Sequence, residues 1–293
     1  MFNGSIVALV TPFKGDRVDE AVFKKMIDWQ IQEGTRGIVP CGTTGEAPTL
    51  SEREQEDVIG LCVQTVAKRI PVIAGTGSNS TLEAVHMTKH AARVGADAVL
   101  VVTPYYNRPT NKGIYLHYKA VSESAQIPII LYNIAGRTGR NIEPDLMARL
   151  ASDFKNIVGV KEASGSLDQM LRIKELCPKD FFITSGDDAL TLPILAIGGV
   201  GVVSVAANIA PRDVALLISA FNQGDIKKAQ EINLKLLPLV RALFIETNPI
   251  PVKKACEMMG LCNGVLRLPM CDMEEANLAK LREALRNYGL IKG

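Results

Sequence analysis

The sequence predicts an α/β fold, a (β/α)₈ TIM barrel with a C-terminal helical appendage. Two observations carry this prediction. Eight short apolar runs recur along residues 1–224, and helix signals lie between successive runs. Strands that alternate with helices pair in parallel. Eight such units in about 220 residues suit a closed barrel better than an open sheet.

The expected strands are β-branched or otherwise apolar runs bounded by glycine, proline or polar residues. They are Ser5–Val10, Gly37–Pro40, Pro71–Gly75, Ala98–Val102, Pro128–Tyr132, Ile157–Lys161, Phe182–Ser185 and Gly201–Ser204. The spacing between successive runs leaves room for one crossover helix each time.

Helix start and stop signals fill these intervals. Asp19 opens a helix with its apolar residues on one face, and Ser-x-x-Glu capping boxes begin helices at Ser51 and Ser80. Gly34 and Gly95 follow helix ends, where a left-handed residue is favoured. These signals indicate that the connections between strands are helical.

The strand pattern stops after Gly224, and helices over Asp225–Glu246 and Met273–Tyr288 follow. We therefore expect residues 1–224 to form the barrel that carries the active site. Residues 225–293 are expected to form the C-terminal helical region. No low-complexity segment or linker indicates an independent domain.

Charge and composition exclude several function classes. The chain has 293 residues, with 33 Lys plus Arg against 31 Asp plus Glu, so a net charge of +2 offers no field for nucleic acid or an anionic membrane. The most hydrophobic stretch, Ile194–Ala210, is interrupted by glycines and polar residues and indicates a helix end, a turn and a strand rather than a membrane span.

Cysteine and histidine spacing favours a cytoplasmic protein without a metal centre. The six cysteines include no CxxC pair and are expected to be reduced and mostly buried. His86 and His90 are four residues apart on an expected helix but lack an HExxH pattern, so a helix face is favoured over a shared metal. The N-terminus has no signal-peptide pattern.

The strand Ile157–Lys161 ends on a lysine, a residue seldom buried. Barrel enzymes keep their chemistry at the C-terminal ends of the strands. Lys161 shares a strand face with Gly159, which would leave open space beneath the lysine stem if that face is the interior. An amine in a water-poor mouth can attack a carbonyl substrate and form a Schiff base. The alternative is that Lys161 reaches solvent or pairs with Glu162.

Reactive or ligand-binding side chains also follow other strands. Tyr132 ends the fifth strand, and its phenol could move protons. Thr43 and Thr44 lie in a glycine-rich turn, Tyr106 follows the fourth strand, and Arg137 suits a carboxylate ligand. Each alone has an ordinary structural explanation, as a packed tyrosine, a turn, an aromatic pair or a surface arginine. Because all of them are expected at one rim of the barrel, together they favour an active site.

Six segments carry a resemblance to a known family. They are GTTGE (42–46), TPYYNRPT (103–110), YNxxxRTG (132–139), GVKEASG (159–165), SGDD (185–188) and NPIPVKKA (248–255). Over essentially the whole chain the sequence resembles the dihydrodipicolinate synthases of the N-acetylneuraminate lyase superfamily. The resemblance implies condensation of pyruvate with L-aspartate 4-semialdehyde, the first committed step of the diaminopimelate route to lysine, with no metal or organic cofactor.

The resemblance also implies catalytic roles. Lys161 matches the Schiff-base lysine and Tyr132 the proton donor and acceptor. Thr43 and Tyr106 match the rest of a hydroxyl relay, in which the tyrosine at the Tyr106 position reaches in from a neighbouring subunit. The implied assembly is a homo-oligomer, a homotetramer built as a dimer of dimers.

Four further positions match substrate-binding residues of the family. Thr44 matches the group that holds the pyruvate carboxylate, and Arg137 the arginine that receives the carboxylate of the aldehyde substrate. Gly186 and Val203 match positions whose backbones line the pocket. Ala135 departs from the family, which usually has a proline there, so the segment that carries Arg137 loses a restraint on φ.

A second departure concerns feedback by lysine, which binds at the dimer interface of sensitive family members. The positions that match this site are Asn79, Glu83 and Tyr105. Those that depart from it are Ala47, Glu52 and Gln55. Lysine inhibition is left open, and a titration of activity with lysine decides it.

Three alternative functions remain. A sister aldolase, acting on N-acetylneuraminate or a 2-keto-3-deoxy-sugar acid, would commonly lack an arginine at Arg137 and often carry serine at Thr43. A sugar-phosphate barrel could use Gly198-Gly199 or GTGSNS (75–80), but no lysine or arginine lies close to either. A binding protein without catalysis would be expected to lose Lys161 or Tyr132.

Overall fold

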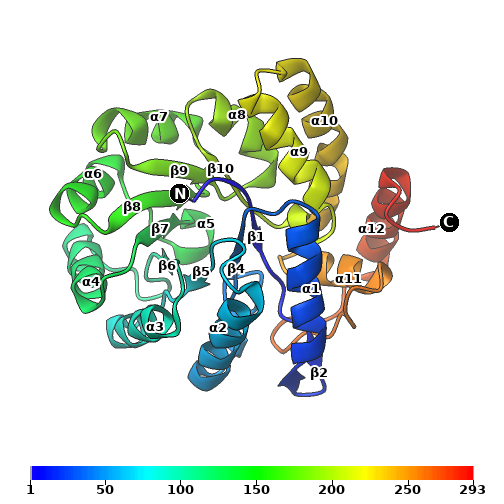
Figure 1. The fold of residues 1–293 in the computed structure, drawn as a ribbon, viewed down its shortest axis with the longest axis horizontal. Coiled ribbons are helices and arrows are strands. Elements are labelled where there is room, and N and C mark those ends of the chain that lie inside the picture. Colours follow the sequence, from blue (N-terminus) through cyan, green and yellow to red (C-terminus); the bar gives the residue numbers. More distant parts are fainter. Residues whose placement is uncertain (1, 293) are drawn as a thin grey trace.

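In the computed structural model, which describes residues 2–292, eight strands form the centre of the molecule (Figure 1). They are β1 (Gly4–Ala8), β4 (Gly37–Val39), β5 (Ile73–Gly75), β6 (Ala98–Val102), β7 (Ile129–Asn133), β8 (Ile157–Glu162), β9 (Phe182–Ser185) and β10 (Gly201–Ser204). All eight predicted strands are confirmed.

The sheet closes on itself. Its strands pair in parallel in the order β4-β1-β10-β9-β8-β7-β6-β5. The two ends of this order meet where Ile38 of β4 bridges Val72, and the Ile38 N–H donates to the Pro71 carbonyl at 3.0 Å. The Gly75 N–H donates to the Pro40 carbonyl at 2.9 Å. The predicted (β/α)₈ barrel is therefore confirmed.

Helices surround the barrel (Figure 1). Those within the strand-bearing part of the chain are α1 (Glu20–Gln32), α2 (Glu52–Val66), α3 (Thr81–Val94), α4 (Asn111–Ser124), α5 (Ala135–Thr138), α6 (Pro144–Asp153), α7 (Leu167–Leu176), α8 (Thr191–Ala196) and α9 (Pro211–Asn222). Short 3₁₀ turns, η1 (Ala47–Thr49), η2 (Asp188–Leu190) and η3 (Ala206–Asn208), lie in the connections after β4, β9 and β10.

Most of the predicted helix caps form. The Asp19 carboxylate accepts from the Val22 N–H at the start of α1, and Gly95 ends α3 with φ of 90°. The capping box at Ser51 is complete. The one at Ser80 is half formed, because the carboxylate of Glu83 instead accepts from the Ser78 hydroxyl at 2.6 Å. The prediction of a second complete box was wrong.

Alternation along each strand produces two apolar layers. One layer fills the barrel interior and includes Ile6, Leu100, Ile130, Tyr132 and Val203. The other lies between the strands and the surrounding helices and continues into the helices that follow β10.

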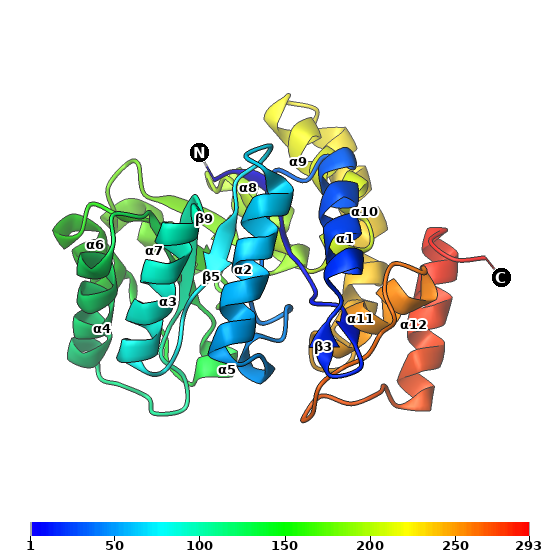
Figure 2. The same ribbon diagram turned by 60° about the horizontal axis from the view of Figure 1, so that its bottom comes forward.

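Three helices follow α9 within residues 2–292, α10 (Ile226–Leu243), α11 (Ile250–Met258) and α12 (Glu275–Tyr288). The helices predicted over 225–246 and 273–288 are thus confirmed. α10 packs against α9, and α12 packs against α10. Figure 2 shows α11 beside α1 and a hairpin of two short strands, β2 (Phe13–Lys14) and β3 (Arg17–Val18), which the sequence pattern did not indicate. α12 packs on α11. No helix within 2–292 combines the length and the apolar character needed to cross a bilayer.

Candidate active site

Lys161 points into the barrel. It pairs with Tyr132 of β7 in the parallel register, and paired residues of neighbouring strands face the same side. The side chain is 6% exposed, and its Nζ lies 4.1 Å from the centroid of the Tyr132 ring. Within residues 2–292 no carboxylate lies within 4.0 Å of this ammonium. A lysine without a counter-ion at the end of a barrel strand can attack a carbonyl carbon.

Glu162 does not pair with Lys161. It is fully buried on the other face of β8, where its carboxylate accepts from the Ser164 N–H at 2.7 Å and from Asn133 Nδ2 at 3.0 Å. Gln169 of α7 donates to the same carboxylate at 3.2 Å. The alternative of a salt bridge between the two neighbours is therefore wrong, because alternation along the strand sends them to opposite faces.

The space around the lysine stem comes from a different glycine than predicted. A Cβ on Gly159 would lie 2.6 Å from the ring of Phe182, so that ring fills the space beneath Lys161. A Cβ on Gly186 would lie 3.1 Å from Lys161 Cε and 2.7 Å from Ala163 Cβ. The expected open space at Gly159 was wrong, because the neighbouring strand β9 supplies an aromatic side chain. Gly186, a predicted pocket residue, is where a side chain would collide with the lysine.

A cavity of about 400 Å³ opens at the C-terminal ends of β4 to β7. Thr43, Tyr132 and Arg137 line it, and Tyr132 connects it to the buried Lys161. Val203 of β10 is buried in the interior apolar layer together with Tyr132. The structure therefore brings Lys161 and Val203 together with Thr43, Tyr132 and Arg137 in one chain, and Thr44 lies in the same turn as Thr43. Gly186 joins them through its contact with the lysine stem.

Arg137 lies in the four-residue helix α5 rather than in the loop that we expected. Its Nη2 donates to the backbone carbonyl of Asn248 at 2.9 Å. Ala135 is the first residue of α5, where a proline would also fit a helix. The guanidinium is thus held at the cavity wall by a residue of the C-terminal region.

Tyr106 is separate from the other predicted residues. It is 88% exposed, follows β6, and has φ of 68°, a left-handed value that is uncommon for a bulky residue. The cavity is lined instead by its neighbour Tyr105. Within one chain the structure does not bring the Tyr106 hydroxyl to Lys161.

Several positions discussed for lysine feedback line the same cavity. These are Ala47, Glu52, Gln55, Glu83 and Tyr105. Gln55 Nε2 donates to the Ala47 and Leu50 carbonyls at 3.1 and 3.2 Å. Asn79 is not among the lining residues, and its carbonyl accepts from Asn107 Nδ2 at 3.0 Å.

The turn that carries the two threonines is strained at both ends. Cys41 and Glu46, which flank Gly42–Gly45, have φ of 53° and 56°. Non-glycine residues adopt such values at a cost and only where their surroundings hold them. Thr44 is 3% exposed, and its Oγ1 accepts from Asn248 Nδ2 at 3.0 Å. Burial raises the pKa of the Cys41 thiol, so this cysteine stays protonated beside the threonines.

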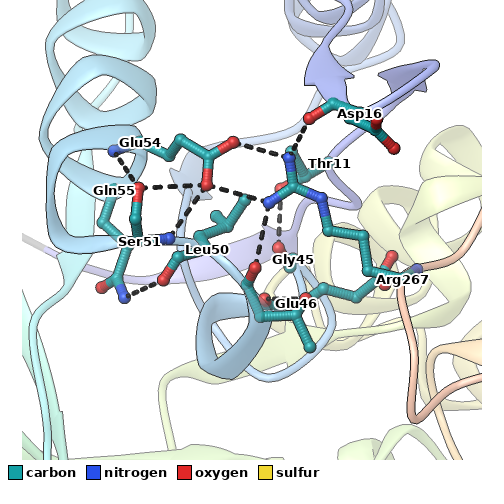
Figure 3. Close-up of polar contacts among 10 residues, drawn as sticks. Thr11, Asp16, Gly45, Glu46, Leu50, Ser51, Glu54, Gln55 and Arg267 are labelled. Atoms are coloured by element: carbon teal, nitrogen blue, oxygen red, sulfur yellow. Dashed lines mark hydrogen bonds and ion pairs between the residues drawn. The ribbon is translucent and has the colours of Figure 1, made fainter.

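Arg267 of the C-terminal region binds the segment that follows this turn (Figure 3). Its Nη1 and Nη2 donate to the Glu54 carboxylate at 2.9 and 2.6 Å, in a bidentate pair. Nη1 also donates to the Thr49 carbonyl at 2.9 Å, and Nη2 to the Asp16 carbonyl at 2.6 Å. The guanidinium therefore connects the β2–β3 hairpin, η1 and the start of α2.

A buried ion pair fixes Glu46, the residue at the end of this turn. Lys253 of α11 is fully buried and forms a short contact with Glu46, whose other oxygen accepts from the Arg267 N–H at 3.1 Å. The Lys253 ammonium also lies 4.0 Å from the centroid of the Phe13 ring. Together with Asn248, these contacts make the C-terminal region part of the site's framework.

Sequence reasoning gave no role to Asn248, Lys253, Arg267 or Glu46. One signal was present, since Lys253 is a charged residue among apolar α11 positions such as Val252, and an unpaired buried lysine is rare. Its partner Glu46 is 207 residues away in the chain and could not be identified locally. Residues 2–292 contain no group of three or more His, Cys, Asp or Glu side chains placed to hold a metal ion.

Comparison with known proteins places these features in context. The model of the Dihydrodipicolinate synthetase family matches residues 1–288. The 4-hydroxy-tetrahydrodipicolinate synthase of Endomicrobium trichonymphae is 58% identical over 292 residues, with 100% of both chains covered. The crystal structure of dihydrodipicolinate synthase from Aquifex aeolicus has a TM-score of 0.98 and 50% identity, again with 100% of both chains covered. A monomeric dihydrodipicolinate synthase variant has a TM-score of 0.97 and 43% identity, covering 99% of this chain and 98% of the variant.

Proposed function

The chain belongs to the dihydrodipicolinate synthetase family and has the 4-hydroxy-tetrahydrodipicolinate synthase activity of its relatives, a lyase activity, and we propose that Lys161 carries it by forming a Schiff base with pyruvate. The observation that supports this role is the placement of Lys161. Its stem lies inside the barrel, its ammonium has no counter-ion within residues 2–292, and the phenol ring of Tyr132 lies 4.1 Å away.

The chemistry begins when the Lys161 amine adds to the carbonyl carbon of pyruvate and water leaves, which forms an iminium. The positive nitrogen draws electrons from the neighbouring methyl group, which loses a proton and becomes an enamine. The enamine carbon attacks the aldehyde carbon of L-aspartate 4-semialdehyde, and the new oxyanion takes a proton. The amino group of that substrate then attacks the iminium carbon and displaces the lysine, closing the ring of the product.

Each proton transfer needs a group within reach of the reacting centre. Tyr132 is the donor and acceptor beside the lysine, and Thr43 lines the same cavity. Tyr106 completes the relay from a second copy of the chain. Its 88% exposure and left-handed backbone support this assignment, because they present the ring outward from its own subunit.

Two carboxylates require binding groups. Thr44 and the region of Gly186 and Val203 hold pyruvate near Lys161. Arg137, at the wall of the cavity, receives the carboxylate of the aldehyde substrate through its planar fork. The sister aldolases, N-acetylneuraminate lyase and 2-keto-3-deoxy-sugar-acid aldolase, are not favoured, since the similar full-length relatives are 4-hydroxy-tetrahydrodipicolinate synthases.

The assembly follows from the relay. A tyrosine supplied by a partner requires at least a dimer, and we assign a homotetramer built as a dimer of dimers in the cytoplasm. The monomeric variant among the related structures makes this assignment worth measuring. Sedimentation of the wild-type protein at assay concentration tests it, and a monomer with full activity would contradict the shared relay.

The central test is reductive trapping. Wild-type protein incubated with pyruvate and borohydride should carry a stable adduct on Lys161, located by peptide mass mapping. Lys119→Met is a control, because Lys119 is an exposed lysine of α4 that pairs with Glu123 and has no part in the site. Its trapping should equal that of the wild type, whereas Lys161→Met should show none. Adducts spread over exposed lysines would refute the mechanism.

A coupled assay tests the substrates. Product should form from pyruvate and L-aspartate 4-semialdehyde, with no cleavage of N-acetylneuraminate. The reverse outcome would assign the chain to the sister activity while leaving the Lys161 Schiff base intact.

A further inference from the structure

Asn248 contacts both of the groups that we assign to substrate carboxylates. Its Nδ2 donates to Thr44 Oγ1 at 3.0 Å, and its backbone carbonyl accepts from Arg137 Nη2 at 2.9 Å. The residue is 5% exposed, and it lies two residues before α11 in the C-terminal region. No other residue within 2–292 joins these two side chains by hydrogen bonds.

The contact with Thr44 determines what its hydroxyl can do. A threonine hydroxyl has one proton to donate and accepts through its oxygen. Here the oxygen accepts from Asn248, and within residues 2–292 the proton has no acceptor. An amide donor cannot take that proton, so the hydroxyl is oriented to donate to another group. A carboxylate, which only accepts hydrogen bonds, is the complementary ligand.

The amide of Asn248 has a further unusual feature. Among residues 2–292 its Oδ1 is buried without a hydrogen-bond partner, although most buried polar atoms in proteins are satisfied. The orientation that leaves Oδ1 unsatisfied is the one that gives Thr44 its donor.

Asn248 is itself held firmly. The Ile250 N–H donates to the Thr247 carbonyl at 2.9 Å, and α11 starts immediately afterwards. Three residues further along, Lys253 ties α11 to Glu46 at the end of the turn that carries Thr44. The Asn248 amide and Thr44 therefore lie on two segments that the Lys253–Glu46 ion pair also joins.

We propose that Asn248 is a positioning residue that orients the Thr44 hydroxyl as a donor to the pyruvate carboxylate, while its backbone carbonyl orients Arg137 for the second carboxylate. The inference rests on the proposed function. It assigns the two contacts to different atoms of one residue. A side-chain substitution removes the first contact and keeps the second.

Because the two contacts use different atoms of Asn248, a substitution of the side chain can separate their effects on the two substrates. Asn248→Ala should raise the KM for pyruvate about 10-fold, equivalent to about 1.4 kcal/mol, and leave the KM for L-aspartate 4-semialdehyde within about 2-fold. Asn248→Asp keeps the shape but replaces the donor with an anion beside the substrate carboxylate. Its KM for pyruvate should rise further, about 100-fold, because like charges repel and Thr44 would donate to the aspartate instead.

Coupling to Thr44 distinguishes positioning from a structural effect. Thr44→Val keeps the shape and removes the hydroxyl, and in that background Asn248→Ala should change the KM for pyruvate by less than about 2-fold. Asn277→Ala is the matched control, since Asn277 Nδ2 donates to Glu246 at 2.9 Å in the same region without touching the turn. Its two KM values should equal those of the wild type.

Three results would overturn the proposal: an unchanged KM for pyruvate in both Asn248 variants, an equal rise for both substrates, or full additivity with Thr44→Val. Folding is checked by thermal unfolding of each variant. If the alanine variant does not fold, the isosteric aspartate variant decides the question. Failure of the proposed function is separate, because wild-type protein would then show no pyruvate adduct on Lys161 after borohydride.

Discussion

Replacing Glu46 with glutamine should destabilise the protein strongly, because it removes the counter-ion of a fully buried lysine. The Lys253 and Glu46 side chains are 0% and 1% exposed. Burial already lowers the pKa of Lys253, with Glu46 as the main opposing influence. Breaking a buried ion pair on one side costs about 3–5 kcal/mol, since the remaining charge is left without a partner or solvent.

This loss converts into a melting temperature. Unfolding entropy near the midpoint is about 2.1 cal/mol/K per residue, so a chain of 293 residues has about 0.6 kcal/mol/K. A loss of 3–5 kcal/mol then lowers Tm by about 5–8 °C. Calorimetry at fixed protein concentration measures this change without interference from mass action on the assembly.

Two further variants identify the cause. Glu46→Gln combined with Lys253→Met removes both charges and should recover most of the lost Tm, because no unpaired charge is then left buried. Arg172→Met breaks an exposed pair, with side chains 48% and 65% exposed, and should change Tm by less than about 2 °C. A Glu46→Gln protein that melts within about 2 °C of the wild type would refute the argument from the buried charge.

Three other predictions concern pH and the relay. The hydrogen bond from Arg267 lowers the pKa of Glu54 from 4.5 to about 2. The ionised Glu54 therefore stabilises the fold fully above pH 4.5, and this contribution is lost as the pH falls towards 2. The Tm advantage of wild type over Arg267→Met should shrink between pH 5 and 3, and a constant advantage would contradict this. Burial lowers the pKa of His117 from 6.5 to about 4, so only the unfolded chain takes up this proton in that window, and stability should fall by up to about 3 kcal/mol as the pH drops from 6.5 to 4. In urea titrations His117→Gln should lose this component, and an unchanged pH slope would argue against it. Tyr106→Phe should lower kcat about 100-fold and leave Tm nearly unchanged, since it removes only the hydroxyl and keeps the ring that enters the second copy. A kcat within 2-fold of wild type would exclude Tyr106 from the relay.

The strands and their order along the chain followed from the sequence, and the residues at the other strand ends favoured a Lys161 that faces the barrel interior. Side chains alternate along a β-strand with a period of two, so a run such as Ile157–Lys161 indicates which residues share a face. The closed barrel then follows from counting units, and the register between β7 and β8 places Lys161 beside Tyr132 as the strand-end argument expected. These features are local or repeat at fixed spacing.

The errors occurred where a side chain outside the expected pattern decides the outcome, or where an element is too short to give a pattern. Gly159 leaves room in its own strand, but Phe182 from β9 fills that room. Glu83 fits a capping box by spacing, but the Ser78 hydroxyl takes its carboxylate. The two-residue strands of the hairpin and the single turn of α5 are too short to produce a periodic signal.

The amino-acid sequence by itself determined the barrel, the strand-end lysine and the tyrosine beside it, because periodicity and strand direction are properties of contiguous residues. Only the tertiary structure decided that Asn248, Lys253 and Arg267 hold the turn with Thr44. Those partners lie 204 to 221 residues away from the groups they contact. Such pairs meet because the closed barrel and the return path of the C-terminal helices bring them together, and no local pattern encodes which distant side chain arrives.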